Sequence, residues 1–190
     1  MLDLFIENKI ITKKNFLIEK FPRAEYDNCT FIDCIFSDSD LSNNSFIECE
    51  FDSCNLSMTN FKNTSFKDVN FKNCKVLGIH FHNCDEFLLQ LNFDNCYLNL
   101  VSFYQLKLKG IKFNDCKLIE TDFTETNLTN SVFNNCDLKG TIFENTLLEK
   151  ADFRTSFNYI IDPEINSIKK AKFSRQEISG LLSKYDIYIE

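Results

Sequence analysis

The chain has 190 residues, of which 44% are hydrophobic, so it can bury one sizeable core but is short for two independent domains. Its formal net charge of −7 argues against a general binder of nucleic acids or of anionic membranes, because both need a positive surface. Phenylalanine is abundant, with 21 copies, whereas 4 glycines and 2 prolines are few for a chain that has to turn often.

Residues 1–23 are the first predicted element. Ile11, Phe16 and Phe21 are spaced five residues apart. Two residues before Phe16 and Phe21 stand the charged Lys14 and Glu19, whereas small residues occupy the equivalent positions later in the chain. We therefore predict a strand-rich N-terminal cap. The opening MLDLFIENK lacks the apolar stretch of a signal peptide, and no run of about 18 apolar residues exists, so we expect a cytoplasmic protein without membrane contacts.

Residues 24–173 are predicted to form a repeat region. A large apolar residue recurs at every fifth position, and the residue two positions earlier is mostly small. In an extended segment these two positions point to the same side, so each unit turns one large and one small side chain inward. Asn, Asp, Ser and Thr supply the turns between units. The large positions before an interruption are Tyr26, Phe31, Phe36, Leu41, Phe46, Phe51, Leu56, Phe61, Phe66, Phe71, Val76 and Phe81, and those after it run from Phe93 to Phe153.

Residues 20 positions apart are also alike. One column of large positions is phenylalanine from Phe31 to Phe173, and one column of small positions is entirely cysteine (Cys34, Cys54, Cys74, Cys96, Cys116 and Cys136). A period of 20 means four units per coil, with like residues stacked at about 4.8 Å. The sequence therefore predicts an all-β quadrilateral β-helix with 20 residues per coil and about seven and a half coils.

All nine cysteines occupy the small inward position. Cysteine behaves as a small, often buried hydrophobic residue, and disulfides are rare in the cytosol. We therefore expect buried reduced thiols, not a disulfide framework.

The repeat is interrupted once, between Phe81 and Phe93, which are 12 apart instead of 10. Placing the two extra residues between Cys84 and Leu88 makes Leu88 the missing inward residue. A break in a repeat often marks a loop on the binding face, although a bulge without a function is an equal alternative. The predicted loop consists of Asp85, Glu86 and Phe87.

Residues 154–190 close the chain. Up to Phe173 we predict one last irregular coil with a turn at Asp162-Pro163. Ser174 and Glu177 have the spacing of a capping box, so residues 174–190 are predicted to form a short α-helix over about 175–184 and a strand over 186–190. This segment either covers the end of the rod or also forms a two-fold homodimer contact. The predicted contact residues are Ile178, Leu181, Leu182 and Tyr185.

Candidates for chemistry are few. His80 and His82 are the only histidines, and both are predicted to point outward, whereas the nearby Cys84 points inward. The H-x-H-x-C spacing therefore does not make a zinc site, and no cysteine has the histidine partner that a nucleophile needs. We expect no catalytic residue, no metal and no cofactor, and the protein is not expected to be an enzyme.

Charge is arranged in bands along the chain. Residues 24–61 contain eight acids and no Lys or Arg, residues 62–117 contain eight bases and five acids, and residues 118–153 contain seven acids and two bases. An acidic band is suited to a basic protein partner, although a charged surface also serves solubility. The predicted partner-binding residues are Glu25, Asp27, Asp33, Asp38, Asp40, Glu48, Glu50 and Asp52.

The repeat of a small residue, an Asp or Asn at many units, a central Phe or Leu and two variable residues resembles the pentapeptide-repeat proteins, over residues 24–153. The resemblance implies a right-handed coil. Within that family the Phe and Leu columns, the turn at Asp162-Pro163 and the C-terminal helix resemble the bacterial quinolone-resistance proteins and their relatives, although the chain lacks their long projecting loops.

That second resemblance implies a homodimer that mimics DNA, binds DNA gyrase or topoisomerase IV and protects it from quinolones. The alternative hypothesis is a generic pentapeptide-repeat interaction scaffold with another protein partner. In both cases the protein would act by binding, without direct contact to nucleic acid.

Overall fold

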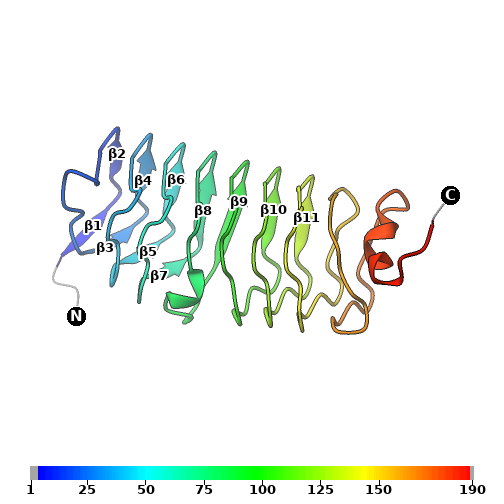
Figure 1. The fold of residues 1–190 in the computed structure, drawn as a ribbon. Coiled ribbons are helices and arrows are strands. Elements are labelled where there is room, and N and C mark those ends of the chain that lie inside the picture. Colours follow the sequence, from blue (N-terminus) through cyan, green and yellow to red (C-terminus); the bar gives the residue numbers. More distant parts are fainter. Residues whose placement is uncertain (1–3, 189–190) are drawn as a thin grey trace.

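The computed structural model describes residues 4–188, which form an all-β parallel solenoid. Its coils stack into a rod with the two chain ends at opposite ends (Figure 1). The strands of the described residues are short because the chain turns after each of them. They are β1 (Phe5–Glu7), β2 (Ile10–Thr12), β3 (Glu25–Asp27), β4 (Thr30–Ile32), β5 (Ser45–Ile47), β6 (Glu50–Asp52), β7 (Ser65–Lys67), β8 (Val69–Lys72), β9 (Leu91–Asp94), β10 (Lys112–Asn114) and β11 (Val132–Asn134).

The strands build two parallel sheets. One has the order β1-β3-β5-β7 and the other the order β11-β10-β9-β8-β6-β4-β2. In the second sheet Phe31 pairs with Phe51, and Phe51 with Phe71, so paired residues are 20 apart in the sequence. Across the interruption Phe71 pairs with Phe93, and this sheet continues without a break.

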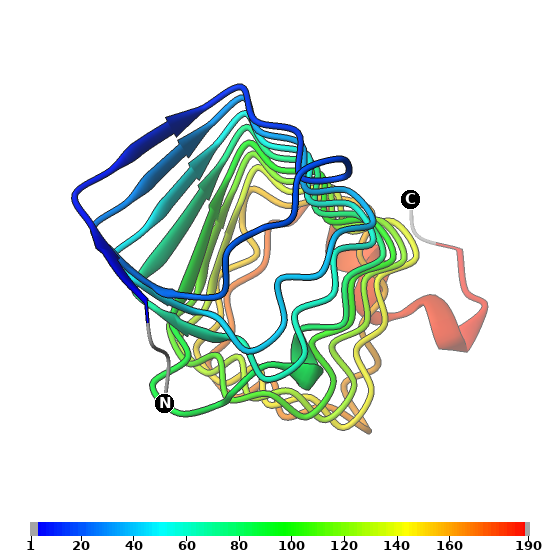
Figure 2. The same cartoon turned by 90° about the vertical axis from the view of Figure 1, so that its left-hand side faces the viewer.

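Parallel pairing continues around the rod on four faces, which Figure 2 shows from the N-terminal end. Face A carries β1, β3, β5 and β7 and, beyond the interruption, the bridges that begin at Lys107. Face B carries the seven-stranded sheet. Face C carries the bridges from Asn15 to Phe157, and face D carries those from His80 to Ile142 together with the bridge that contains Asp40.

The inward residues form one continuous core along the rod. Rings stack from coil to coil: the ring centroids of Phe113 and Phe133 are 5.1 Å apart, and those of Phe31 and Phe51 are 4.8 Å apart. The small residues beside them are hydrogen-bond donors. The Thr121 hydroxyl donates to the carbonyl of Leu98 at 2.7 Å, which gives this buried acceptor a second and shorter bond beside that from the Val101 N–H at 3.4 Å.

The turns between units use left-handed backbone. Most turn residues are Asn or Asp, such as Asn28 (φ 48°) and Asp33 (φ 54°), which tolerate positive φ better than other residues that have a Cβ. Leu100 adopts the same conformation, with φ 59°, although its side chain does not favour it. The scarcity of glycine is thus compensated mainly by Asn and Asp.

Two short 3₁₀ helices replace the predicted C-terminal α-helix, so that prediction was wrong. They are η2 (Ile178–Leu181) and η3 (Ser183–Tyr185), and a third 3₁₀ helix, η1 (Phe81–Asn83), precedes the interruption. The Gly180 carbonyl accepts a hydrogen bond from the Ile161 N–H at 3.0 Å. This carbonyl therefore bonds to the last coil, whereas in an α-helix it would accept a hydrogen bond from within the helix. Ser174 Oγ does accept the Glu177 N–H at 3.2 Å, as the capping-box spacing predicted. The predicted final strand is absent over residues 186–188, and residues 189 and 190 lie outside the described part.

The inward residue at the interruption was predicted one position too early. Leu88 is 64% exposed and occupies a left-handed turn position, whereas Leu89 packs against the core. The turn is closed by a hydrogen bond from Leu89 N–H to the carbonyl of Glu86. With two leucines in succession, the turn conformation decides which one is buried.

At the N-terminal end the predicted strands are present within the described residues. Phe5 pairs with Glu25, and Ile10 pairs with Thr30, so β1 and β2 extend the two sheets. Phe16 stacks on Phe36 with a centroid distance of 4.8 Å. Residues 1–3 of the predicted cap lie outside the described part.

Candidate functional site

Most acids of the predicted binding band lie on two adjoining faces. Glu25 and Asp27 project from β3 on face A, and Glu50 and Asp52 project from β6 on face B. Glu48 lies in the turn between those faces. Of the remaining acids, Asp33 follows β4 at the far edge of face B, whereas Asp38 and Asp40 lie toward face D. The backbone register therefore brings together five of the eight residues, which we call the acidic patch: Glu25, Asp27, Glu48, Glu50 and Asp52.

Neighbouring groups reduce the charge of this patch. Lys72 Nζ lies 2.6 Å from Glu50 Oε2, and this hydrogen bond raises the pKa of the Lys72 ammonium. Asp52 Oδ1 accepts a hydrogen bond from the Asn73 amide at 2.9 Å. A neutral amide leaves the charge of Asp52 in place, and Glu25, Asp27, Glu48 and Asp52 form no ion pair among the described residues, so these four supply the free negative charge. The preceding coil is basic and contains Lys9, Lys13, Lys14, Lys20 and Arg23.

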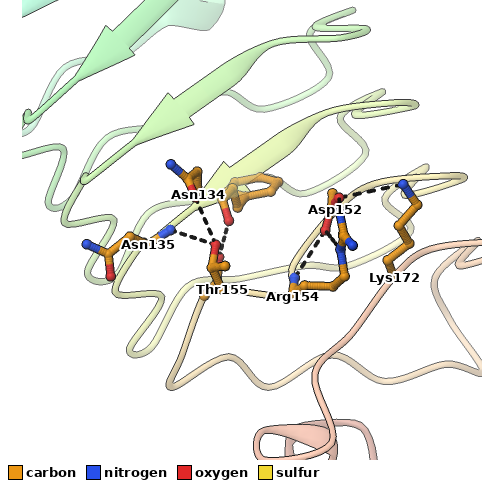
Figure 3. Close-up of polar contacts among 8 residues, drawn as sticks. Asn134, Asn135, Asp152, Arg154, Thr155 and Lys172 are labelled. Carbon is orange, nitrogen blue, oxygen red and sulfur yellow. Dashed lines mark hydrogen bonds and ion pairs between the residues drawn. The ribbon is translucent and has the colours of Figure 1, made fainter.

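A second charged cluster lies near the other end of face B (Figure 3). Arg154 Nη2 is 2.8 Å from Asp152 Oδ2, and Lys172 Nζ is 3.6 Å from the same oxygen. The hydrogen bonds from Arg154 lower the pKa of the Asp152 carboxyl. Beside this pair, Thr155 Oγ donates to the side chain of Asn134 and accepts the N–H of Asn135. Arg154 and Lys172 share the one carboxylate of Asp152, so the cluster links neighbouring coils and keeps a single net positive charge.

The predicted loop lies beside a groove on the described rod. Asp85 pairs with Ser65, Glu86 is exposed, and Phe87 is 67% exposed. The groove has a volume of about 590 Å³ and opens on face A between this loop and residues 107–111. Apolar residues line it together with three lysines, and Glu48 and Asp68 lie at its other side. The sequence indicated the loop but gave no sign of the groove.

The predicted dimer residues are only partly free. Leu181 packs against the core, and Leu182 is half-buried. Tyr185 is 51% exposed, and its hydroxyl donates to Glu164 at 2.9 Å. Ile178 remains at the surface. The segment therefore contacts the last coil of its own chain and leaves a smaller apolar surface than the sequence pattern implied.

One polar chain on face D was not found from the sequence. The His82 ring nitrogen Nδ1 lies 3.2 Å from Ser102 Oγ, and this hydroxyl donates to Asp122 at 3.1 Å. Burial lowers the pKa of His82. In a hydrolytic triad the imidazole stands between the hydroxyl and the carboxylate, whereas here the serine stands in the middle. The three residues occupy successive coils, and the order of their bonds suits a structural ladder.

Residues 4–188 contain neither a cluster of metal ligands nor a membrane-spanning helix. No group of three or more His, Cys, Asp or Glu side chains is placed to hold a metal ion. No helix there has the length and apolarity needed to cross a membrane.

The sequence matches the family described as pentapeptide repeat region over residues 24–87, 79–153 and 107–181. The chain belongs to the pentapeptide-repeat family. This match covers the whole repeat region, the irregular last coil and the first part of the C-terminal segment. No curated protein matches the chain.

Solved structures of pentapeptide-repeat proteins resemble the rod. A trypsin-treated variant of QnrB1, a plasmid-mediated fluoroquinolone resistance protein, is 18% identical with a TM-score of 0.60, and the match covers 98% of this chain and 91% of that chain. Full-length QnrB1 is also 18% identical, with a TM-score of 0.48, and the match covers 96% of this chain and all of that chain. HetL of the cyanobacterium Nostoc, a protein involved in regulating heterocyst differentiation, is 10% identical with a TM-score of 0.38, and the match covers 90% of this chain and 86% of that chain. At these identities the QnrB1 variant supports the fold alone.

Proposed function

We propose that this pentapeptide-repeat protein acts as a protein-binding rod whose acidic patch contacts the basic DNA-binding surface of a type II topoisomerase. The observation that carries the proposal is the grouping of Glu25, Asp27 and Glu48 on faces A and B without an ion pair among the described residues. Such a surface offers a basic partner some of the charge that the DNA backbone offers. By this proposal the protein binds DNA gyrase or topoisomerase IV in the cytoplasm and protects it from quinolones.

We also propose that two chains associate through the C-terminal segment, with Ile178 and Tyr185 as exposed contact residues. A two-fold contact there would place both acidic patches at the outer ends of one longer rod. The coil is proposed to be right-handed, as the family resemblance implies. Light scattering on the purified protein would report the mass of two chains.

A specific observation favours a second candidate function. DNA carries one charge per about 1.7 Å, so a rod of about 35 Å would need about 20 charges to match it. The formal net charge here is −7, and the basic first coil lies next to the acidic patch. These charges suit a generic interaction scaffold with a smaller basic partner, for which DNA mimicry is not required.

The test is a gyrase supercoiling assay with and without a fluoroquinolone. Low micromolar protein is expected to restore supercoiling in the presence of the drug, or to inhibit it in the drug's absence. The double variant Glu25→Lys/Asp27→Lys should require at least tenfold more protein, because it reverses charge at two side chains that form no hydrogen bond or ion pair within residues 4–188. The control Glu120→Lys/Glu144→Lys makes the same charge change elsewhere and should shift the response less than twofold. No effect of the wild-type protein on gyrase or on topoisomerase IV would contradict the topoisomerase proposal and favour the scaffold.

A further inference from the structure

The groove at the interruption coincides with a gap in the parallel pairing of face A. On this face Ser65 pairs with Asp85, and Lys107 pairs with Asn127, but Asp85 and Lys107 do not pair. No backbone hydrogen bond joins residues 86–90 to residues 106–111, although both segments lie within the described rod. On faces B and C pairing passes the same level without a gap. At this level the two inserted residues therefore separate neighbouring coils on face A, whereas face D has its own gap one coil earlier, where Asn60 and His80 do not pair.

The gap on face A leaves a short strand edge without a partner. Within the Lys107 and Asn127 pair, the bonds to Asn127 are made by the Leu106 carbonyl and the Leu108 N–H. The N–H and C=O of Lys107 consequently point toward the displaced loop, and neither has a hydrogen-bond partner within residues 4–188. Unpaired edges of this kind accept an extended peptide as an added strand.

The groove offers side-chain contacts on both sides of that edge. Leu88 and Leu89 line it on the side of the loop, and Leu88 is 64% exposed. Lys107 and Lys109 line the other side, and both are exposed. A third lysine, Lys67, also lines the groove and lies 6.0 Å from the ring of Phe87.

Two acidic residues, Asp68 and Glu48, also line the groove, but neither is a free charge next to Lys107. Asp68 accepts a hydrogen bond from the Gln90 amide at 3.4 Å, and Glu48 lies on the side away from Lys107. Asp85 and Glu86 belong to the neighbouring loop but do not line the groove, so Lys107 and Lys109 are the lining charges next to the unpaired backbone. An occupant with a carboxylate beside Lys107 and Lys109 and an apolar side chain against the leucines would match this arrangement.

We propose that the groove binds an extended acidic segment of a protein partner, which adds as a strand along residues 107–109. The bound peptide occupies the position on face A that is filled at other levels by the strand of the neighbouring coil. Its backbone bonds to Lys107, its acidic side chains contact Lys107 and Lys109, and an apolar side chain packs against Leu88 and Leu89. This site borders the acidic patch at Glu48 but takes an occupant of the opposite charge, and it does not depend on the topoisomerase proposal.

The test uses full-length protein and a fluorescein-labelled peptide of the sequence Glu-Val-Glu-Leu-Thr-Glu, with binding followed by fluorescence anisotropy. Saturable binding is expected at micromolar to submillimolar protein. The same peptide with its central amides N-methylated should bind at least tenfold more weakly, because it cannot pair with Lys107. Hydrogen exchange should slow in residues 104–110 when the unmodified peptide binds.

Matched variants separate this site from a general attraction of charges. Lys107→Glu/Lys109→Glu is expected to weaken binding at least tenfold, whereas Lys62→Glu/Lys139→Glu makes the same charge change elsewhere and should weaken it less than twofold. Deleting Glu86 and Phe87 restores the spacing of 20 and should abolish binding. If this deletion variant does not fold, the lysine variants and the exchange measurement decide the question. Absence of peptide binding, equal binding by both lysine variants or unchanged exchange at 104–110 would overturn the proposal.

Discussion

The regular rod and the C-terminal segment of this protein are stabilised in different ways. Between residues 24 and 153 the inward side chains are almost completely buried, and in the column from Phe31 to Phe153 each ring stacks on the ring of the next coil. Beyond residue 153 the burial is incomplete, and Phe173 and Leu181 are only partly covered. Lys184 forms ion pairs there with Asp162 at 2.7 Å and Glu164 at 2.6 Å. A repeated apolar core thus gives way to a few specific contacts, which single changes can remove.

The largest expected effect breaks the rod itself. Phe113 is fully buried between Phe93 and Phe133, so Phe113→Asp would bury a charge without a partner. We expect the loss of more than about 4 kcal/mol and an unfolded protein by circular dichroism. Phe113→Leu keeps the site apolar and should cost only about 1 to 2 kcal/mol. A folded Asp variant would contradict the stacked core.

A smaller effect should release the C-terminal segment alone. Gly180 lies against Tyr159, and a Cβ at Gly180 would overlap the Tyr159 carbonyl oxygen and approach its ring to 2.9 Å. Gly180→Val is therefore expected to detach η2 and η3 while the rod stays folded. Limited proteolysis should then cleave after residue 173, whereas Ser179→Ala, a neighbouring exposed change, should leave the segment protected. Loss of the circular dichroism signal of the whole protein would show that the segment and the rod unfold together.

The smallest effect concerns a turn within the rod. Leu100 adopts φ 59° and is 61% exposed, so Leu100→Gly would relieve backbone strain at little loss of packing. We expect stabilisation of about 1 kcal/mol in urea unfolding. Gly110 has φ 73° and no neighbour close to an added Cβ, so Gly110→Ala should destabilise by about the same amount. Equal and opposite shifts would show that turn conformation acts independently of the core.

The parallel solenoid and its inward columns were predictable because the repeat places one environment at one position of every unit. Leu88 shows where this rule fails, since two successive leucines satisfy the pattern and only the turn conformation distinguishes them. The C-terminal helix was mispredicted because local spacing said nothing of the bond between Ile161 and Gly180. The capping-box spacing correctly predicted the local bond between Ser174 and Glu177, but it could not predict how the C-terminal segment packs on the last coil.

The candidate sites were predictable only in part. The acids of residues 25–52 stand out in the sequence, but their grouping on faces A and B follows from the backbone register. Lys72 and Glu50 are separated by more than one coil length of sequence and meet only because the repeat stacks their coils. A short stretch of sequence therefore does not reveal this ion pair. The groove has the same origin, because the loop and Lys107 meet only when coils stack.

The buried thiols of the rod have a consequence for chemical reactivity. All nine cysteines are free and buried, and they are distributed over the coils from Cys29 to Cys136. Burial raises the pKa of Cys49 to about 12 and raises that of Cys84 further, so neither is an effective nucleophile while the coils are closed. A thiol reagent must wait until a coil opens locally. The cysteines are therefore built-in reporters, and the order in which they become alkylated would trace where along its length the rod first opens.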